Sequence, residues 1–425
     1  MTFQALPGFR DFFPRDLAQR ATIFERWRQI ARRYGFEEYD GPPLEPLDLY
    51  TRKSGEEIVG QLYTFTDKGG REVSLRPEMT PTLARMVAAQ ASTLRKPVRW
   101  FSIPQLFRYE RQQKGRLREH FQLNMDIIGE GDVSADAELL ASAIDIVRSF
   151  GLGAGDVRAR ISDRRLLQGL LSLVGVDAAR LPRVYQVVDK LGREPRESLA
   201  RKLSEAGFDA PQIDRIFAVL ETTDLESLRE RYADAPALRE DFVRLERYFG
   251  YLRALGLADW VTFDLSIVRG LAYYTGIVFE LFDASGEFRA ICGGGRYDGL
   301  LASLGGVDLP ALGFGMGDVV LGELLRSRGL LPAVETGVDV WIAFDDSAGL
   351  VEAMRLATRL RDRGRSVEYA LGGQQLSRQR KAAHAARARE LVTLTPEDLA
   401  RGEAMVRRMS DGAEERVRLD SWVEK

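Results

Sequence analysis

The chain has 425 residues, of which 45% are hydrophobic and 29% are charged, and its formal net charge is −2. This composition excludes a disordered or fibrous protein, and the length suggests roughly two to four domains. The small net charge means that any contact with nucleic acid must come from a local basic patch.

The first elements follow from hydrophobic periodicity. Apolar residues recur at helical spacing in residues 15–34, which predicts an amphipathic helix ending at Gly35. A short strand should follow and either stop at the prolines of "GPPLEP" or lie on a sheet edge, because proline cannot extend a ladder. Residues 61–80 are predicted to form a hairpin around the turn "DKGG", and residues 81–92 a helix.

Two further predicted strands flank an arginine-rich loop. "VRWFSIPQLFRYER" and "HFQLNMDIIGE" have strand character, and the basic segment between them is a hairpin loop. Side chains alternate faces along a strand, so Gln122, Asn124 and Asp126 share one face, as Arg108 and Glu110 do. A polar face among apolar neighbours is costly to bury unless something satisfies it. We therefore predict a binding floor here, although an arbitrary arginine-rich loop is more often a solvated, salt-bridged hairpin.

The middle of the chain is predicted to be helical, at residues 134–150 and 164–254. Strand patterns return in "VTFDLSIV", "YYTGIVFELFD" and "FRAICGGGRYDG". A sheet, a block of helices and then more sheet predict an α+β domain with a helical insertion. The glycines of the last segment indicate either close approach to a ligand or a bulge.

The C-terminal part alternates regularly between strands and helices. Strands are predicted at 338–344, near 366–370 and at 391–395, with helices at 347–364 and near 375–388. This order predicts a small α/β domain with a largely parallel sheet. We divide the chain into a first domain, 1–330, with its insertion at about 164–254, and a second domain, 337–425, joined by a linker at 330–337.

Cysteine and histidine are scarce. Cys292 stands alone, so no disulfide can form within the chain, which fits a reducing compartment. His120 and His384 are the only histidines, too few for a usual zinc site or serine–histidine hydrolase. The N-terminus does not read as a signal peptide, and no stretch approaches the ~20 apolar residues of a membrane span. We expect a cytoplasmic protein that uses arginine and carboxylate chemistry.

Several segments carry a resemblance to a known family. "FRYERQQKGRLREHFQ" resembles motif 2 of the class II aminoacyl-tRNA synthetases, and specifically of the histidyl-tRNA synthetase family. "LRPEMTPTLAR" resembles the family's amino-acid-binding segment, and "VRGLAYYTGIVFE" and "CGGGRYDGL" its two distinctive segments. "GFRDFFP" also fits, and "RYGFEEYDGPPLE" is similar to motif 1 with its proline at Pro43. The C-terminal domain is similar to the family's anticodon-binding domain, so the resemblance spans nearly the whole chain.

The resemblance implies a class II fold and a two-step reaction. L-histidine and ATP form histidyl-adenylate and pyrophosphate, and the histidyl group then passes to the terminal adenosine of tRNA-His. The implied ligands are ATP with Mg²⁺, and no metal is held by the protein alone. A homodimer is also implied. The alternative is a histidine-sensing regulatory paralogue of the ATP phosphoribosyltransferase complex, which charges no tRNA and usually lacks the C-terminal domain. A non-catalytic tRNA-binding module is a third class, disfavoured by the amino-acid pocket.

The resemblance also assigns residues. Catalysis falls to Arg108, expected at the α-phosphate, and to Arg269, expected where other class II enzymes place a metal ion. The residues expected to bind ATP are Arg108, Glu110, Arg116 and Arg269. Those expected to bind histidine are Glu78, Met79, Thr80, Gln122, Asp126, Tyr273, Tyr274 and Tyr297. Those expected to reach the tRNA are Arg111, Gln113 and Arg118. Without the resemblance, Arg269 would be interpreted as part of a salt bridge at a strand end, and the tyrosines as residues packed in the core.

Two positions depart from the family pattern. Motif 3 normally ends in an arginine that grips the ATP γ-phosphate, and here that position holds Val320. Arg326 lies nearly two helical turns further on and is no substitute. Ala272 stands where the family usually has an aspartate. Arg116 and Mg²⁺ are then left to hold the outer phosphates.

Overall fold

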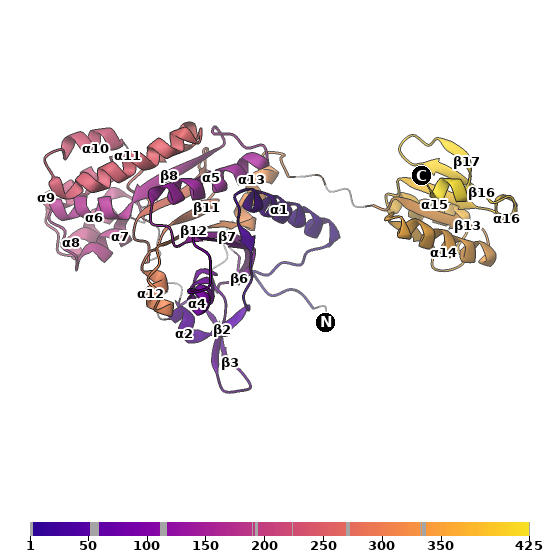
Figure 1. Ribbon diagram of the computed structural model, residues 1–425, viewed down its shortest axis with the longest axis horizontal. Coiled ribbons are helices and arrows are strands. Elements are labelled where there is room, and N and C mark those ends of the chain that lie inside the picture. The colour runs from indigo at the N-terminus through magenta and orange to yellow at the C-terminus, as the bar shows by residue number, and fades with distance from the viewer. Residues whose placement is uncertain are drawn as a thin grey trace. The chain divides into compact units, whose positions relative to one another are not determined.

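The chain consists of two compact units, Met1–Pro332 and Ala333–Lys425 (Figure 1). The computed structural model describes residues 3–51, 59–110, 117–188, 190–191, 194–222, 224–268, 273–331, 333 and 337–424. The predicted linker at 330–337 includes residues 332 and 334–336, which lie outside this described part.

The first unit is built on a nine-stranded sheet. Its strand order is β1-β5-β7-β12-β11-β10-β8-β9, and β6 pairs with β7. The strands are β1 (Glu37–Glu38), β5 (Val98–Ser102), β6 (Gln105–Phe107), β7 (Glu119–Ile128), β8 (Val157–Asp163), β9 (Val261–Phe263), β10 (Ile277–Asp283), β11 (Cys292–Arg296) and β12 (Ala311–Gly317). All pairs are antiparallel except β1–β5 and β8–β9. The predicted α+β fold, with one sheet continuing after a helical block, is confirmed.

A smaller sheet stands beside the large one. Its order is β2-β4-β3, with β2 (Leu44–Pro46), β3 (Tyr63–Thr66) and β4 (Glu72–Leu75). The β3–β4 pair is the predicted hairpin, and it extends away from the body of the unit in Figure 1. Pro46 ends β2 at the edge of this sheet, where a missing N–H is tolerated.

Helices bury one face of the large sheet. The helix α5 (Val133–Ser149) packs against β7, β11 and β12, while α1 (Pro14–Arg33) and α11 (Arg239–Ala254) pack against α5. Alternation along β12 explains this, because Leu312, Phe314 and Met316 join the main apolar core with α5. On the opposite face α4 (Thr80–Gln90) packs against α12 (Leu300–Gly305). The alternating glycines of β12 are therefore left on the side away from α5.

The helical insertion follows β8. It comprises α6 (Arg164–Leu173), α7 (Leu181–Val188), α8 (Arg196–Glu205), α9 (Ala210–Leu220), α10 (Leu225–Arg231) and α11, gathered near β8 in Figure 1. The strand β8 itself was not predicted, because arginines at alternate positions of "VRARISD" hide its buried face. The strand predicted over "VTFDLSIV" is too long. It ends at Phe263, and Asp264 then accepts a hydrogen bond from the Ser266 N–H in a turn.

The second unit contains a mixed five-stranded sheet of order β14-β13-β15-β16-β17. Its elements are β13 (Val340–Phe344), α14 (Ser347–Asp362), β14 (Val367–Tyr369), α15 (Leu376–Ala385), β15 (Glu390–Leu394), α16 (Pro396–Leu399), β16 (Glu403–Arg408), β17 (Glu414–Arg418) and α17 (Leu419–Val423). The predicted strands and helices up to β15 are present, and β14, β13 and β15 are parallel. The sheet is less parallel than predicted, because β16 and β17 add an antiparallel hairpin.

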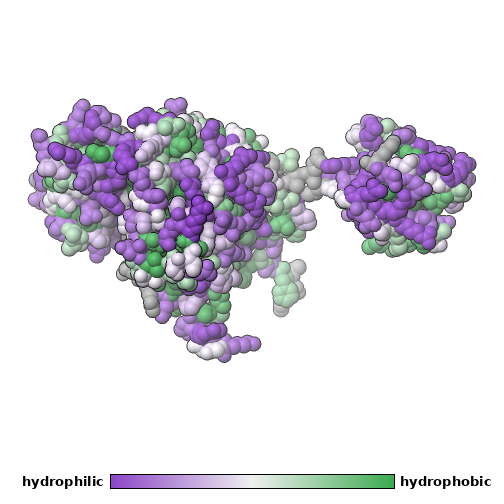
Figure 2. Space-filling model, viewed as in Figure 1, coloured by the Kyte–Doolittle hydropathy of each residue, from purple (hydrophilic) through white to green (hydrophobic). Residues whose placement is uncertain are grey.

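The surface of each unit is mainly hydrophilic on the face shown in Figure 2, with hydrophobic residues in scattered patches. Within the described ranges, none of the helices combines the length and the apolar character needed to cross a membrane.

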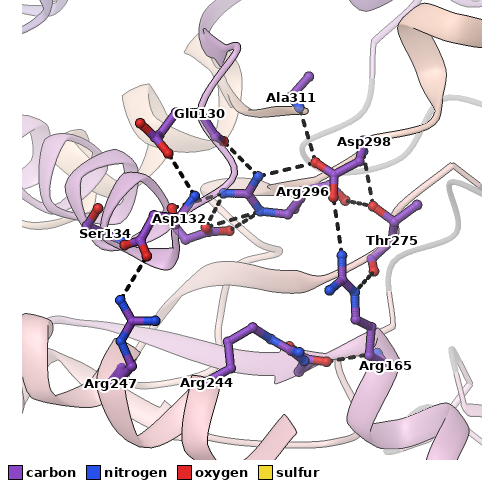
Figure 3. A network of polar contacts seen from close by, with 12 residues as sticks. Glu130, Asp132, Ser134, Arg165, Arg244, Arg247, Thr275, Arg296, Asp298 and Ala311 are labelled. Carbon is purple, nitrogen blue, oxygen red and sulfur yellow. Dashed lines mark hydrogen bonds and ion pairs between the residues drawn. The ribbon is translucent and has the colours of Figure 1, made fainter. Parts of the chain in front are cut away.

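A buried arginine joins the end of β11 to α5 (Figure 3). Arg296 is only 5% exposed. Its guanidinium donates to the Asp136 carboxylate, to the Glu130 carbonyl at 2.9 Å and to Asp298 Oδ1 at 3.2 Å. Burial raises the pKa of Asp136 to about 6, and Arg296 opposes this rise. The pair therefore holds two otherwise costly buried charges together.

The same network attaches the insertion to the sheet. Arg165 of α6 donates to the Thr275 carbonyl at 3.1 Å and to Asp298 at 3.3 Å. Arg244 of α11 donates to Asp163, at the end of β8, at 2.8 Å. Thr275 follows two tyrosines that the sequence analysis assigns to the site, so the insertion supports that segment of the chain.

We predict that Arg296→Met destabilises the first unit by about 3–5 kcal/mol, because it leaves the Asp136 carboxylate buried without its partner. Urea denaturation followed by circular dichroism measures this as a lower midpoint. Arg247→Met is the matched control, since Arg247 is 51% exposed beside Asp132 and its removal should leave the midpoint unchanged. Equal midpoints for the parent and the Arg296 variant would contradict the prediction.

Candidate active site

Glycines on two neighbouring strands form a trough in the large sheet. On β12, Gly313 and Gly315 pair with Gly295 and Gly293 of β11, so the central strands carry no side chains on this face. On the other side, the same β12 glycines pair with Asp126 and Asn124 of β7. The trough is therefore edged by polar side chains.

The glycines are needed because those polar side chains lie across β12. A Cβ atom at position 313 would lie 1.9 Å from Asp126 Oδ1, and one at position 315 would lie 2.6 Å from Gln122 Nε2. Any larger residue would push the carboxyl or the amide out of the trough. The β12 glycines thus make room for neighbouring side chains of the protein, and β11 is regular rather than bulged at Cys292–Arg296.

A small cavity of about 60 Å³ opens in this trough. Its lining includes Glu78, Thr80, Arg108, Gln122, Asn124, Asp126, Tyr273, Tyr274 and Tyr297. The structure thus brings together all of the predicted histidine-binding residues except Met79. The Met79 side chain is buried at the start of α4, where Arg76 Nη1 lies 3.9 Å from its sulfur, so it supports the wall instead of lining the cavity.

Two tyrosine–carboxylate contacts organise the cavity. The Tyr297 hydroxyl donates to Asp126 Oδ1, and the Tyr273 hydroxyl donates to Glu78 Oε2 at 3.2 Å. The Tyr273 and Tyr297 rings meet edge to face with centroids 5.8 Å apart. Both carboxyl groups are held in fixed orientations by side chains from distant parts of the sequence.

Burial dominates the ionisation of Asp126. Asp126 is 4% exposed, and this desolvation raises its pKa to about 7, although the hydrogen bond from Tyr297 favours the charged form. Burial and the same carboxylate raise the pKa of Tyr297 well above 10. The Asp126 carboxyl is therefore a hydrogen-bond acceptor in the cavity, and a partner with an N–H group would stabilise its charged form.

A larger hollow of about 520 Å³ adjoins the cavity and shares Arg108, Gln122, Gly293 and Gly315 with it. Arg108 donates from Nε to the Pro77 carbonyl at 2.9 Å, and its Nη1 lies 4.0 Å from Glu110 Oε1. Glu110 also lines the hollow, as do His120 and Val320. The motif 2 arginine therefore stands where the two spaces meet.

His120 is neutral at physiological pH. Burial of the imidazole lowers its pKa to about 3, and the positive charges of Arg108 and Arg10 add to the effect. It contributes a flat, uncharged ring to the hollow. Phe121, the next residue, points to the other side and packs against Phe12 and Phe24.

The N-terminal segment "GFRDFFP" fixes the two sides of the hollow to each other. Arg10 donates to Glu119, at the start of β7, at 2.6 Å and to Asp318, at the start of α13 (Asp318–Ser327), at 2.9 Å. Asp318 also accepts the Phe121 backbone N–H at 2.9 Å. Motif 2 and motif 3 are thus joined through one guanidinium.

Several predicted residues lie outside the described ranges: Arg111, Gln113, Arg116, Arg269 and Ala272. Arg118 is described at the base of the loop, where its guanidinium stacks 4.1 Å from the Tyr109 ring centroid and its carbonyl accepts the Arg108 N–H. Its predicted contact with tRNA stays a prediction.

The sequence analysis missed Glu280, Phe282 and Arg289, which all line the larger hollow. The alternation in "YYTGIVFELFD" already puts Glu280 and Phe282 on one face, opposite the core residues Phe279 and Leu281. The period-two glycines of "LGFGMG" were the corresponding signal for the trough. No pattern within the sequence singles out Arg289.

Family models match both parts of the chain. The model described as "Histidyl-tRNA synthetase" matches residues 8–317, and the one described as "Anticodon binding domain" matches residues 340–425. A histidine–tRNA ligase of Opitutus terrae is 44% identical over 97% of this chain and 95% of its own length. The chloroplastic/mitochondrial histidine–tRNA ligase of Arabidopsis thaliana is 42% identical over 97% of this chain and 84% of its own.

Solved structures share the fold. Histidyl-tRNA synthetase from Nostoc covers 100% of this chain and 99% of its own with a TM-score of 0.82 at 22% identity. An ATP phosphoribosyltransferase regulatory subunit/histidyl-tRNA synthetase from Bacillus halodurans covers 93% of this chain and 99% of its own with a TM-score of 0.77 at 22% identity. The antiparallel sheet with its separate anticodon-binding domain defines a class II aminoacyl-tRNA synthetase. Within that class, the chain belongs to the histidyl-tRNA synthetase family.

We predict that Gly313→Ala weakens histidine binding by about tenfold or more, because the new methyl group displaces the Asp126 carboxyl and breaks a charged hydrogen bond. Isothermal titration with L-histidine measures the loss. Gly299→Ala is the control, because a Cβ there meets nothing within 4 Å. Unchanged histidine affinity in the Gly313 variant would show that the trough does not hold the ligand.

We predict a pH-dependent stability difference between Asp126→Asn and the parent. Folding raises the pKa of Asp126 from 3.8 to about 7, so between these values the folded protein holds a proton that the unfolded chain has lost. The contribution of this group to the free energy of unfolding therefore falls as pH rises, by at most about 1.4 kcal/mol per pH unit. Asparagine does not titrate, so the urea midpoint of the variant should rise relative to that of the parent as the pH increases from 5 to 8. A constant difference would contradict the raised pKa.

Proposed function

We propose that this chain is a histidine–tRNA ligase whose amino-acid site is the small cavity and whose ATP site is the larger hollow. The observation that carries the assignment is the buried Asp126–Tyr297 pair at the closed end of a glycine trough that leads to Arg108. Relatives that match nearly the whole chain are histidine–tRNA ligases, which supports the same activity.

Histidine fits the polar lining by its chemistry. The Asp126 carboxyl, held by Tyr297, accepts a ring N–H, and Tyr274 closes the same side. Glu78, Thr80 and Gln122 supply oxygens for the α-ammonium group. An analogue of similar size that lacks the ring N–H would leave the buried carboxyl unpaired. Sites of this kind reject such analogues by about 10⁴-fold or more in favourable cases.

The first chemical step needs orientation and charge stabilisation rather than a protein nucleophile. A carboxylate oxygen of histidine attacks the α-phosphorus, the bond to the bridging oxygen breaks, and pyrophosphate leaves with that electron pair. Arg108 stands between the two spaces and stabilises the charge that grows on the α-phosphate oxygens. Arg269 has the same role by family resemblance.

The second step transfers the histidyl group. A hydroxyl of the terminal adenosine attacks the histidyl carbonyl carbon, and AMP leaves with the electron pair of the anhydride bond. Gln122 lines both spaces and holds the amino acid while the hydroxyl approaches. Arg111, Gln113 and Arg118 of the motif 2 loop guide the tRNA end.

The carboxylates of the hollow suit Mg²⁺ that arrives with ATP. Glu110 and Glu280 both line it, and one or two carboxylates with substrate phosphates are a usual ligand set for Mg²⁺. Within the described ranges no cluster of three His, Cys, Asp or Glu residues could hold a metal ion, so the phosphates would complete the coordination. The ion would neutralise charge on the phosphates.

The second unit would bind the anticodon arm. Gln379 and Ala383 form the buried side of α15, whereas Arg378, Arg380 and Lys381 are exposed. Phosphate contacts from such residues make binding weaken steeply with salt, and unstacked loop bases can be read individually. A solvated helix face explains the same exposure, and salt-dependent tRNA binding separates the two.

A homodimer in the cytoplasm completes the proposal, by family resemblance. The motif 1 helix α1 does not offer its apolar stripe for that contact, because Ile23, Trp27 and Ile30 are all buried within the first unit. The two-fold contact would therefore use other surfaces.

The test is histidine-dependent exchange of pyrophosphate into ATP, followed by charging of tRNA-His. We expect both activities in the intact chain, because it carries the amino-acid cavity, the ATP hollow and the second unit. Exchange without charging would indicate the histidine-sensing paralogue instead. Histidine binding with neither activity would contradict the enzyme assignment altogether.

A further inference from the structure

The larger hollow lacks the usual motif 3 cation. Val320, two residues after the start of α13, lines the hollow with an apolar side chain that cannot bind a phosphate. Arg108 stands on the β7 side of the space. The described lining has one other permanently charged cation, Arg289, which the family resemblance did not assign.

Arg289, just before β11, lines the same hollow as Val320. Cys292 of β11 pairs with Met316 of β12, and the ladder runs antiparallel. Just before β11, the Ile291 N–H donates to the Leu281 carbonyl of β10 at 2.8 Å, so the chain that enters β11 stays bound to β10. Three residues before Cys292 is Arg289, and three residues after Met316 is Val319. Arg289 and Val320 thus lie at the same end of the trough, and both line the hollow.

Arg108 and Arg289 lie on opposite sides of β12. Because the sheet order is β7-β12-β11, Arg108 and Arg289 approach the β12–α13 junction from opposite sides. A chain of phosphates that extends from Arg108 across β12 would end beside Arg289.

The charge of the hollow also calls for a second cation. Glu110 and Glu280 contribute carboxylates to the lining, and His120 is neutral because its pKa is about 3. Without Arg289, the described lining would hold one arginine against two carboxylates, so Arg289 balances its charge. Arginine matches phosphate oxygens with a planar fork of donors, and Arg289 is exposed at its rim, where an incoming nucleotide meets it.

We propose that Arg289 binds the outer phosphates of ATP and supplies the charge that Val320 does not. This assignment rests on the proposed function, since it requires the larger hollow to be the ATP site. It makes Arg289 a substrate-binding residue for adenylate formation and not for histidine recognition, because Arg289 does not line the smaller cavity.

The test compares Arg289→Gln with the parent in pyrophosphate exchange. The variant should raise the KM for ATP by about tenfold or more, which corresponds to one lost charged hydrogen bond, and should leave the KM for histidine within about twofold. Its affinity for a non-hydrolysable histidyl-adenylate analogue, which has no outer phosphates, should also stay within about twofold. Arg253→Gln, at an exposed arginine of α11 outside the hollow, is the matched control.

Arg289→Lys separates charge from shape. It should lie between the parent and the glutamine variant, because lysine keeps the charge but loses the fork. An ATP KM within about twofold of the parent for the glutamine variant would overturn the proposal. Equal weakening of ATP and the adenylate analogue, or a lysine variant as weak as glutamine, would overturn it too. A parent protein without exchange would instead contradict the proposed function.

Discussion

A carboxyl group buried inside a sheet is the constraint on which the site depends. Asp126 lies across β12, which is possible only because residue 313 is glycine, and burial raises its pKa to about 7. One hydrogen bond from Tyr297 does not replace the hydration that a carboxylate loses on burial. Under the proposed function, a ligand with a ring N–H supplies a second partner for this carboxyl, which favours histidine over analogues without that group.

The rest of the fold serves to keep that arrangement fixed. Alternation along β7 and β12 sends the apolar side chains to the α5 core and leaves the polar and glycine positions facing the small cavity. Arg10 joins the start of β7 to the start of α13. Arg296 joins the end of β11 to α5, next to Tyr297. Each of these guanidinium groups ties together elements that are far apart in sequence.

The sequence predicted the parts of the site that lie within contiguous motifs. Strand parity was enough to group Gln122, Asn124 and Asp126, and the resemblance brought in the tyrosines and Glu78. The strand β8 was not predicted, because its outward arginines obscure the apolar pattern of its buried face. The antiparallel β16–β17 hairpin was not predicted either, because it follows an otherwise regular α/β pattern. Arg289 was missed for a different reason, because only the folded chain brings it into the lining of the same hollow as Val320. The roles of Arg116 and Arg269 stay predictions.

The most direct test of the account is the affinity of the free protein for histidine and for thiazolylalanine, an analogue of similar size whose ring has no N–H. Isothermal titration at pH 8, where Asp126 is ionised, would compare them. The account predicts that the analogue binds at least about a hundredfold more weakly, because the buried carboxylate keeps no partner but Tyr297. Equal affinities would contradict the claim that Asp126 reads the ring of the amino acid.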